Sequence, residues 1–104
     1  MGIIAIACYR PNQGNERKLL AAVRNNTPLL FSLGLITSRL PIIMKATDGT
    51  ILEIFEWASR SAKSTAHKNP DVMGLWALMM ALGKNVPLKS IPEAKEIFAN
   101  FKPI

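Results

Sequence analysis

The first apolar run of the chain extends without interruption from Ile3 to Tyr9. A run of this length that ends at the turn residues Arg10-Pro11 predicts a strand over residues 3–10. Apolar residues at every position, instead of at alternate positions, are typical of a strand that is covered on both faces. Helices of the same chain can cover one face, so the second face needs another covering layer.

Two further strands are predicted over residues 36–46 and 50–57. They are joined by Asp48-Gly49, a dipeptide typical of the tight turn in an antiparallel hairpin. Pro41 lies inside the first of the two, and a proline cannot donate a hydrogen bond to a neighbouring strand. Residues 36–46 are therefore expected to form an edge strand or to carry a bulge.

Helical spacing of apolar residues predicts a helix between the first two strands. Asn15 is a favourable N-terminal capping residue, and Glu16 lies in the first turn, where the helix dipole favours an acidic side chain. Thr27-Pro28 is expected to interrupt the helix, because Thr27 can cap a new helix that has proline in its first position. Gly34 is expected to end it.

A second helical region is predicted after residue 57. Ser59 is expected to cap a helix that runs to about residue 68. Asn69-Pro70 repeats the pattern of a capping residue followed by proline, so a helix is expected to continue to about Gly83.

The remaining part of the chain predicts a short fourth strand over residues 86–89 and a terminal helix over residues 93–101. Ser90 and Glu93 have the spacing of a capping box, which indicates the start of that helix. The complete order is β-α-β-β-α-β followed by a helix, and this is the order of the ferredoxin-like split unit. We therefore expect one α+β domain over residues 1–104, with a four-stranded antiparallel sheet.

The face of the sheet that the helices leave uncovered predicts a homodimer. Of the 104 residues, 49% are hydrophobic and 19% are charged, which is strongly apolar for a small monomer. A chain of this length buries only roughly 60–70% of the surface that its unfolded form exposes. Two protomers that pack sheet to sheet about a twofold axis would cover the remaining apolar surface.

Charge and composition argue against several classes of function. The net charge is +6, but Lys and Arg are scattered, with no run longer than Arg17-Lys18, so nucleic-acid binding is not expected. The single cysteine, Cys8, rules out a disulfide within the chain and a cysteine-based zinc site, and we expect it to be buried and inert. The longest apolar run, residues 72–83, is too short to span a membrane. We expect a soluble, cytoplasmic protein that binds no metal and no membrane.

Two segments carry a resemblance to a known family: Glu53-Ile-Phe-Glu-Trp57-Ala-Ser59, and Ala66-His67-Lys-Asn-Pro70 through Leu75-Trp76. Together with the opening Tyr9-Arg10-Pro11 to Gly14, they resemble the dimeric α+β barrel superfamily, and in particular its antibiotic-biosynthesis-monooxygenase-like branch. The resemblance implies a dimeric barrel, a ligand cavity and, for the quinol-type monooxygenases of that branch, no cofactor. It gives His67 the place of a histidine that borders the cavity and Trp57 the place of a sheet tryptophan near it. Haem-degrading members carry an asparagine on the first strand, which residues 3–10 lack.

His67 is the candidate catalytic base. Histidine is the side chain whose ordinary pKa lies near neutrality, and an oxygenase that uses its substrate as reductant needs a base to form an electron-rich anion. The alternative is a structural histidine that caps helix carbonyls just before Asn69-Pro70. A pocket that His67 borders would favour the first interpretation, and a packed interior with His67 turned to solvent would exclude it.

Four residues are candidate ligand-binding groups. Trp57 and Trp76 would form an aromatic wall for a flat ligand, with Met79 as adaptable apolar surface, and the alternative for all three is ordinary core packing. Arg39 would hold a carboxylate or phenolate, and its alternative is an exposed charge that discourages further strand pairing.

Glu53 and Glu56 are expected on opposite faces of the strand over residues 50–57, because side chains alternate along a strand. If both faces are covered, one of the two carboxylates is buried and needs a partner. Arg10, Arg39 and Lys45 are the candidate partners, most simply in an ion pair at the interface.

Two functions remain open from the sequence. The first is a small cofactor-free enzyme, monooxygenase-like by resemblance, that acts on an aromatic or quinol-type ligand with His67 as base. The second is a non-catalytic ligand-binding or stress-response dimer of the same fold.

Overall fold

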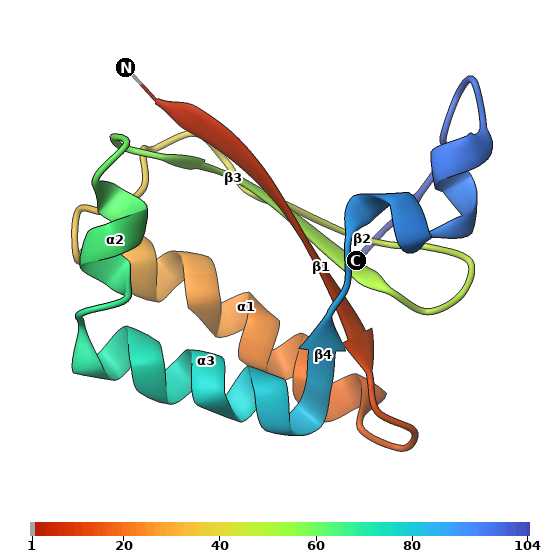
Figure 1. Cartoon of the computed structure of the whole chain (residues 1–104), viewed down its shortest axis with the longest axis horizontal. Coiled ribbons are helices and arrows are strands. Elements are labelled where there is room, and N and C mark those ends of the chain that lie inside the picture. The colour runs from red at the N-terminus through yellow and green to blue at the C-terminus, as the bar shows by residue number, and fades with distance from the viewer. Residues whose placement is uncertain (1) are drawn as a thin grey trace.

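The chain forms an open antiparallel sheet with helices packed on one face, as the computed structural model of residues 2–104 shows (Figure 1). The five strands have the order β4-β1-β3-β2-β5. The elements are β1 (Ile3–Pro11), α1 (Glu16–Ser32), β2 (Ile42–Lys45), β3 (Ile51–Trp57), α2 (Ala62–Ala66), α3 (Pro70–Leu82), β4 (Gly83–Asn85), the 3-10 turns η1 (Leu88–Ser90) and η2 (Pro92–Lys95), and β5 (Lys102–Pro103).

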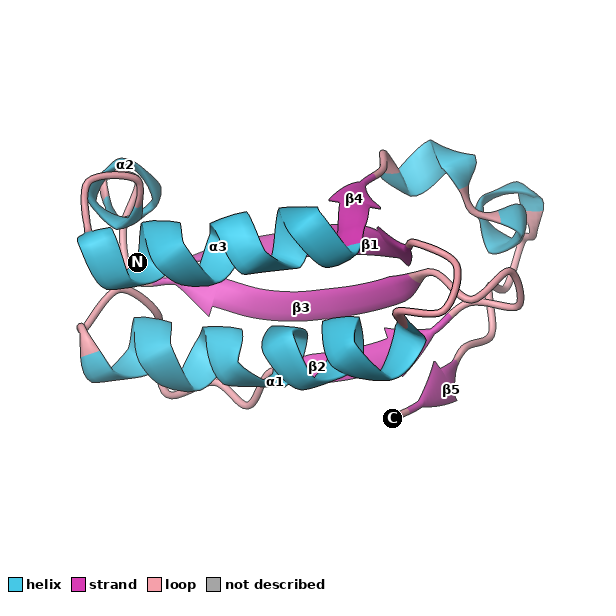
Figure 2. Ribbon diagram, turned by 90° about the horizontal axis from the view of Figure 1, so that it is seen from below, coloured by secondary structure: helices cyan, strands magenta, loops and turns pink. Residues whose placement is uncertain are grey.

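The predicted α+β class is confirmed, and the order of the first four strands is consistent with a ferredoxin-like fold. The sheet has five strands where the sequence predicts four, because Lys102–Pro103 pairs with Met44 and Lys45 at the outer edge of β2. Figure 2 shows α1 and α3 side by side over the same face of the sheet.

The core lies between the sheet and these two helices. Leu19, Val23 and Leu30 of α1 are fully buried and follow one another at helical spacing. They pack in two clusters, with Tyr9 of β1 at one end and Phe55 of β3 toward the other. Full burial of such a side chain contributes about 1.5–3 kcal/mol relative to exposure.

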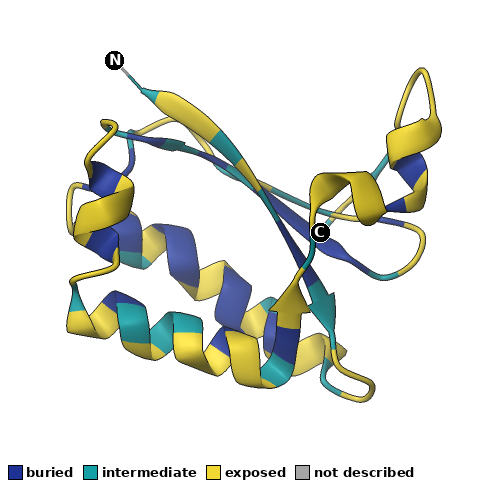
Figure 3. Cartoon of the chain, in the orientation of Figure 1, coloured by how far each residue is buried: buried dark blue, intermediate teal, exposed yellow. Residues whose placement is uncertain are grey.

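The opposite side of the sheet is only partly covered. At one end, the C-terminal segment packs Ile91 against Cys8 and Leu52. At the other end lies a set of isoleucines that we call the open face, with Ile4 57%, Ile6 48% and Ile42 52% exposed and Ile54 half-buried between them (Figure 3). The chain therefore covers both faces of its sheet for only part of their length.

α1 is continuous, so the predicted interruption at Thr27-Pro28 is wrong. Proline removes one hydrogen bond of the helix, but the buried residues on either side of it, Val23 and Leu30, belong to the same stripe. A single helix keeps both against the sheet, and this packing outweighs the local cost of the proline.

Two strands differ in position from the sequence prediction. β2 is shorter than residues 36–46, because Pro41 lies just before it and Ile36 forms only an isolated bridge to Trp57. The fourth strand is Gly83–Asn85 instead of residues 86–89, since Pro87 has no N–H to continue the pairing with β1.

The predicted terminal helix over residues 93–101 is wrong. The 3-10 turn η2 ends at Lys95, and no helix follows before the short strand β5. The carboxylate of Glu93 does not cap a helix, because its Oε2 accepts the Thr47 N–H of the β2–β3 turn at 2.8 Å. A tertiary hydrogen bond thus uses the group on which the capping-box prediction depended.

Several local signals are confirmed. The Asn69 side chain accepts hydrogen bonds from the N–H groups of Asp71 and Val72 and so caps α3. Gly49 has a φ of +91° in the turn between β2 and β3, a conformation that suits glycine. The cap predicted at Ser59 is wrong, because α2 begins after Ser61, whose side chain makes no capping hydrogen bond.

Candidate functional site

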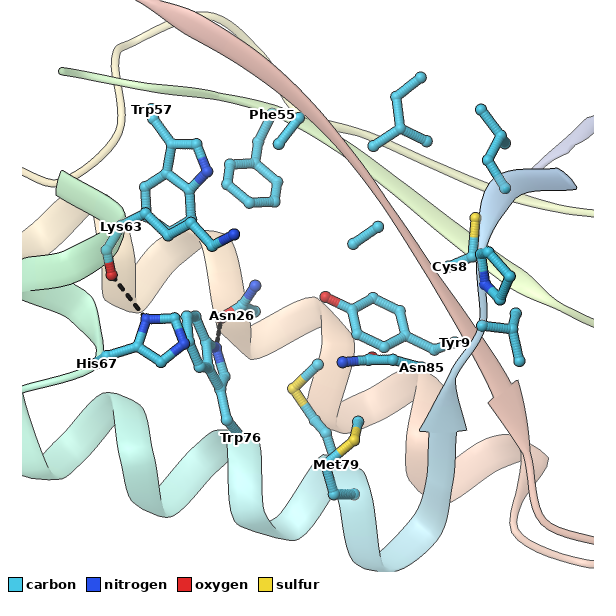
Figure 4. A pocket seen from close by; sticks show the side chains of 17 residues that line it. Cys8, Tyr9, Asn26, Phe55, Trp57, Lys63, His67, Trp76, Met79 and Asn85 are labelled. Carbon is cyan, nitrogen blue, oxygen red and sulfur yellow. Dashed lines mark hydrogen bonds between the residues drawn. The ribbon is translucent and has the colours of Figure 1, made fainter. Parts of the chain in front are cut away.

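A cavity of about 520 Å³ opens between the sheet and the second helical region. It exists because β4 pairs with only the last three residues of β1, so the first part of β1 has no strand beside it at this edge within residues 2–104. Ala5 and Ala7 of β1 also leave space because they are small. The cavity is lined by Ala5, Ile6, Ala7, Cys8, Tyr9, Asn26, Phe55, Trp57, Lys63, His67, Trp76, Met79, Met80, Asn85, Val86, Pro87 and Leu88 (Figure 4).

Four of the five candidate site residues, His67, Trp57, Trp76 and Met79, line this cavity. The chain between Trp57 and Met79 forms α2 and most of α3, which fold back beneath β3 (Figure 1).

His67 ends α2 and uses one ring nitrogen to cap it. Its Nδ1 lies 2.8 Å from the backbone oxygen of Lys63. A carbonyl oxygen only accepts, so Nδ1 must donate and carry the proton, and the neutral ring then has its lone pair on Nε2. The ring also packs edge-to-face on Trp76, with centroids 4.9 Å apart. The capping contact therefore orients the ring of this exposed residue and leaves Nε2 without a hydrogen bond within residues 2–104.

Aromatic side chains form much of the cavity wall. The rings of Trp57 and Phe55 meet edge-to-face with centroids 5.0 Å apart, and both are buried. Trp76 donates its Nε1 proton to Oδ1 of Asn26 at 2.8 Å. Because its N–H is held in this way, Trp76 presents ring surface to the cavity, which suits a flat apolar ligand.

A buried polar network lies behind this wall. The Tyr9 hydroxyl donates to Oε1 of Glu53 at 2.9 Å, and Nδ2 of Asn26 donates to the same oxygen at 3.0 Å. Glu53 has no exposed surface, and within residues 2–104 its Oε2 has no hydrogen-bond partner. Burial raises the pKa of Glu53 to about 7, although the hydrogen bonds from Asn26 and Tyr9 oppose the shift. Burial and the neighbouring Glu53 raise the pKa of Tyr9.

Sequence reasoning found only part of this network. It placed Glu53 and Glu56 on opposite faces of β3, which is confirmed, but the three cationic partners considered for the buried carboxylate are wrong. Glu53 instead meets the neutral groups of Tyr9 and Asn26. Two signals were available: the alternation of β1 puts Tyr9 on the helix-covered face, and the helical spacing of α1 puts Asn26, three residues after Val23 and four before Leu30, on the buried stripe.

Arg39 does not lie with the other candidates. Its Nε donates to Oε1 of Glu56 at 3.2 Å, and the Thr37 hydroxyl donates to the same oxygen at 2.7 Å. These hydrogen bonds, the one from Thr37 foremost, lower the pKa of Glu56. Arg39 borders a separate shallow groove with Phe31 and Leu40. The arrangement agrees with an exposed charge paired at the sheet surface.

Other chemistry-bearing groups add little to the site. Cys8 is buried as expected, and burial raises the pKa of its thiol. Among residues 2–104, no three His, Cys, Asp or Glu side chains come together in a way that would hold a metal ion. The helices of the described chain are all too short or too polar to cross a membrane.

Comparison of the chain with models of known protein families, with curated proteins and with solved structures yields no match. The resemblance to the antibiotic-biosynthesis-monooxygenase-like branch therefore stays a prediction that rests on the residues quoted for it.

Proposed function

We propose that this protein is a small cofactor-independent, monooxygenase-like enzyme that acts on a flat hydroxylated aromatic ligand, with His67 as the base. The observation that carries the proposal is the cavity between sheet and helices, whose wall combines Trp57 and Trp76 with a histidine whose Nε2 forms no hydrogen bond within residues 2–104. A cavity of about 520 Å³ is within the range that holds small-molecule ligands.

The proposed reaction needs only a base and a binding site from the protein. The base removes a phenol or enol proton, and the resulting anion is electron-rich enough to reduce dioxygen, the oxidant. One oxygen atom enters as a carbonyl in place of one ring hydrogen, and the original hydroxyl becomes the second carbonyl as it loses its hydrogen. These two hydrogens leave with the other oxygen atom as water, so the substrate supplies all the electrons. The protein has to orient the ring, exclude bulk water and hold the proton.

The experiment compares two substitutions of His67 in an assay of quinol-dependent oxygen consumption. His67→Gln keeps a side-chain donor for the Lys63 carbonyl but has no base, and His67→Ala removes both. We expect both variants to lose turnover and to bind the ligand still, since the aromatic wall is unchanged. Turnover by His67→Gln at the wild-type rate would refute the role of His67 as base.

Non-catalytic ligand binding is the second candidate, and a specific observation favours it. Three polar side chains of the wall form hydrogen bonds with other protein side chains: Tyr9, Asn26 and Trp76. A wall on which these three side chains bond to protein groups suits retention of an apolar ligand. Tight binding of a quinol without oxygen consumption would support this function over the first.

We also propose that the open face is covered by a second copy of the chain, giving the dimeric α+β barrel expected from the sequence. Ile4, Ile6 and Ile42 would pack against their twofold equivalents, and Ile97 and Phe98, 94% and 83% exposed on the C-terminal segment, would extend the contact. A stable interface needs roughly 800 Å² from each partner.

Sedimentation equilibrium tests the dimer. Ile42→Asp places a charge on the open face and is expected to give a folded monomer, whereas Leu40→Asp, at a highly exposed residue just before β2, is expected to stay dimeric. A wild-type protein that is monomeric at micromolar concentration would contradict the proposal.

A further inference from the structure

The side chains of Tyr9 and Asn26 lie between the carboxyl of Glu53 and the cavity. It does not line the cavity, whereas Tyr9 and Asn26, which both donate to its Oε1, do. Figure 4 shows the Tyr9 hydroxyl pointing toward Asn26 from the side of β1. A phenolic oxygen that donates one hydrogen bond still has lone pairs to accept another. Tyr9 is thus able to bond a ligand hydroxyl on one side and Glu53 on the other.

We propose that Tyr9 and Glu53 form a proton relay through which a phenol or enol bound in the cavity is ionised. The ligand O–H bond breaks and its proton forms a new O–H bond on the Tyr9 oxygen. The original O–H bond of Tyr9 breaks in turn, and that proton binds Oε1 of Glu53. The products are a ligand oxyanion, an unchanged tyrosine that now donates to the oxyanion, and a neutral carboxyl that donates to Tyr9.

The surroundings of Glu53 suit a proton acceptor. Around it, β1 supplies Tyr9, α1 supplies Asn26 and β2 places the apolar Ile43 opposite it. Glu53 forms no ion pair within residues 2–104, and a buried carboxylate without a cation binds a proton more readily than an exposed one. The other titratable side chains on the cavity wall are Cys8, Lys63 and His67.

The pKa of about 7 agrees with this geometry, because a base that works near neutrality is best matched to the proton it moves. Glu53 acts through Tyr9 and does not touch the ligand, so it positions and stores the proton. The relay rests on the proposed function in that a hydroxylated ligand occupies this cavity, and it leaves open whether oxygen then reacts. It assigns the ionisation of that ligand to Tyr9 and Glu53 instead of His67, so variants at Glu53 and His67 decide between the two bases.

Proton uptake on binding of para-nitrophenol tests the relay, because the anion of this probe is yellow and its neutral form is not. At pH values where the free probe and Glu53 are both ionised, binding of the anion must take up one proton, so Kd rises about tenfold per pH unit. In Glu53→Gln, the amide replaces the neutral carboxyl as donor to Tyr9, and we expect tight binding of the anion without proton uptake or pH dependence. Tyr9→Phe is expected to weaken binding of the anion at every pH.

Infrared difference spectra of the wild-type protein give a second readout that needs no variant. Binding of the anion at alkaline pH is expected to produce the carbonyl band of one protonated carboxyl. Absence of that band, or an unchanged pH dependence in Glu53→Gln, would overturn the relay. A pH dependence that disappears in His67→Gln but persists in Glu53→Gln would also overturn it, while the proposed function would stand. Failure of the wild type to bind any phenol would overturn both.

Discussion

Replacing Glu53 by glutamine is expected to change the way in which the free energy of unfolding depends on pH. Burial raises the pKa of this carboxyl from 4.5 to about 7, so between these values the folded protein binds more protons than the unfolded chain. Stability therefore falls as the pH rises through this window. With 1.36 kcal/mol for each pKa unit, the loss attributable to Glu53 reaches about 3 kcal/mol above pH 7.

The assay is urea unfolding followed by tryptophan fluorescence at a series of pH values and one protein concentration. Groups other than Glu53 titrate in both proteins and cancel in the difference between wild type and Glu53→Gln. The difference is expected to move by about 3 kcal/mol in favour of the variant between pH 4.5 and pH 8. Its absolute position also contains the cost of burying an amide N–H₂ where Oε2 has no partner, about 1–3 kcal/mol, so the pH dependence is the quantity to compare.

Glu56→Gln is the matched control, because Glu56 lies on the same strand with its side chain on the other face. Hydrogen bonds from Thr37 and Arg39 lower its pKa, so its contribution is present above the ordinary pKa of a glutamate and is lost as the pH falls. Relative to wild type, Glu53→Gln should therefore gain stability as the pH rises, and Glu56→Gln should lose stability as the pH rises. A difference for Glu53→Gln that stays flat across this range would refute the conclusion that burial of Glu53 raises its pKa.

Four further substitutions test the packing that positions the site. Asn69→Ala removes the cap of α3 and should cost about 1 kcal/mol of unfolding free energy in urea denaturation. Trp57→Ala should lower the free energy of unfolding by about 3–5 kcal/mol and also weaken binding of a phenol. Leu19→Ala should lower it by about 2–5 kcal/mol and leave binding intact, because Leu19 does not line the cavity. Equal binding by both variants would contradict the assigned wall. Glu93→Ala leaves the Thr47 N–H without its acceptor, so amide exchange at Thr47 should accelerate, and unchanged exchange would contradict the contact.

The candidate site illustrates which groups a sequence pattern is able to find. His67, Trp57 and Trp76 stand out by residue type, and they do line one cavity. Tyr9 and Asn26 were missed, because their importance comes from a shared contact with Glu53 across 44 and 27 residues of sequence. Long-range partners of this kind have no local signature.

The sequence by itself determined the α+β class, the β2–β3 hairpin and the cap of α3. Each of these depends on interactions between residues that are close along the chain, such as the hydrogen bonds from Asp71 and Val72 to Asn69. The same local rules determined which face of β3 Glu53 occupies, since side-chain alternation is a property of the strand alone.

Only the tertiary structure decided the continuity of α1 through Pro28, the hydrogen-bond partner of the Glu93 carboxylate and the partners of Glu53. In each case a local preference of about 1–3 kcal/mol competed with contacts to a distant segment. Packing against the sheet keeps α1 continuous through its proline, and the Glu93 carboxylate accepts the Thr47 N–H instead of capping a helix. Burial of Glu53 among neutral partners followed from where α1 lies on the sheet, which no stretch of sequence specifies on its own.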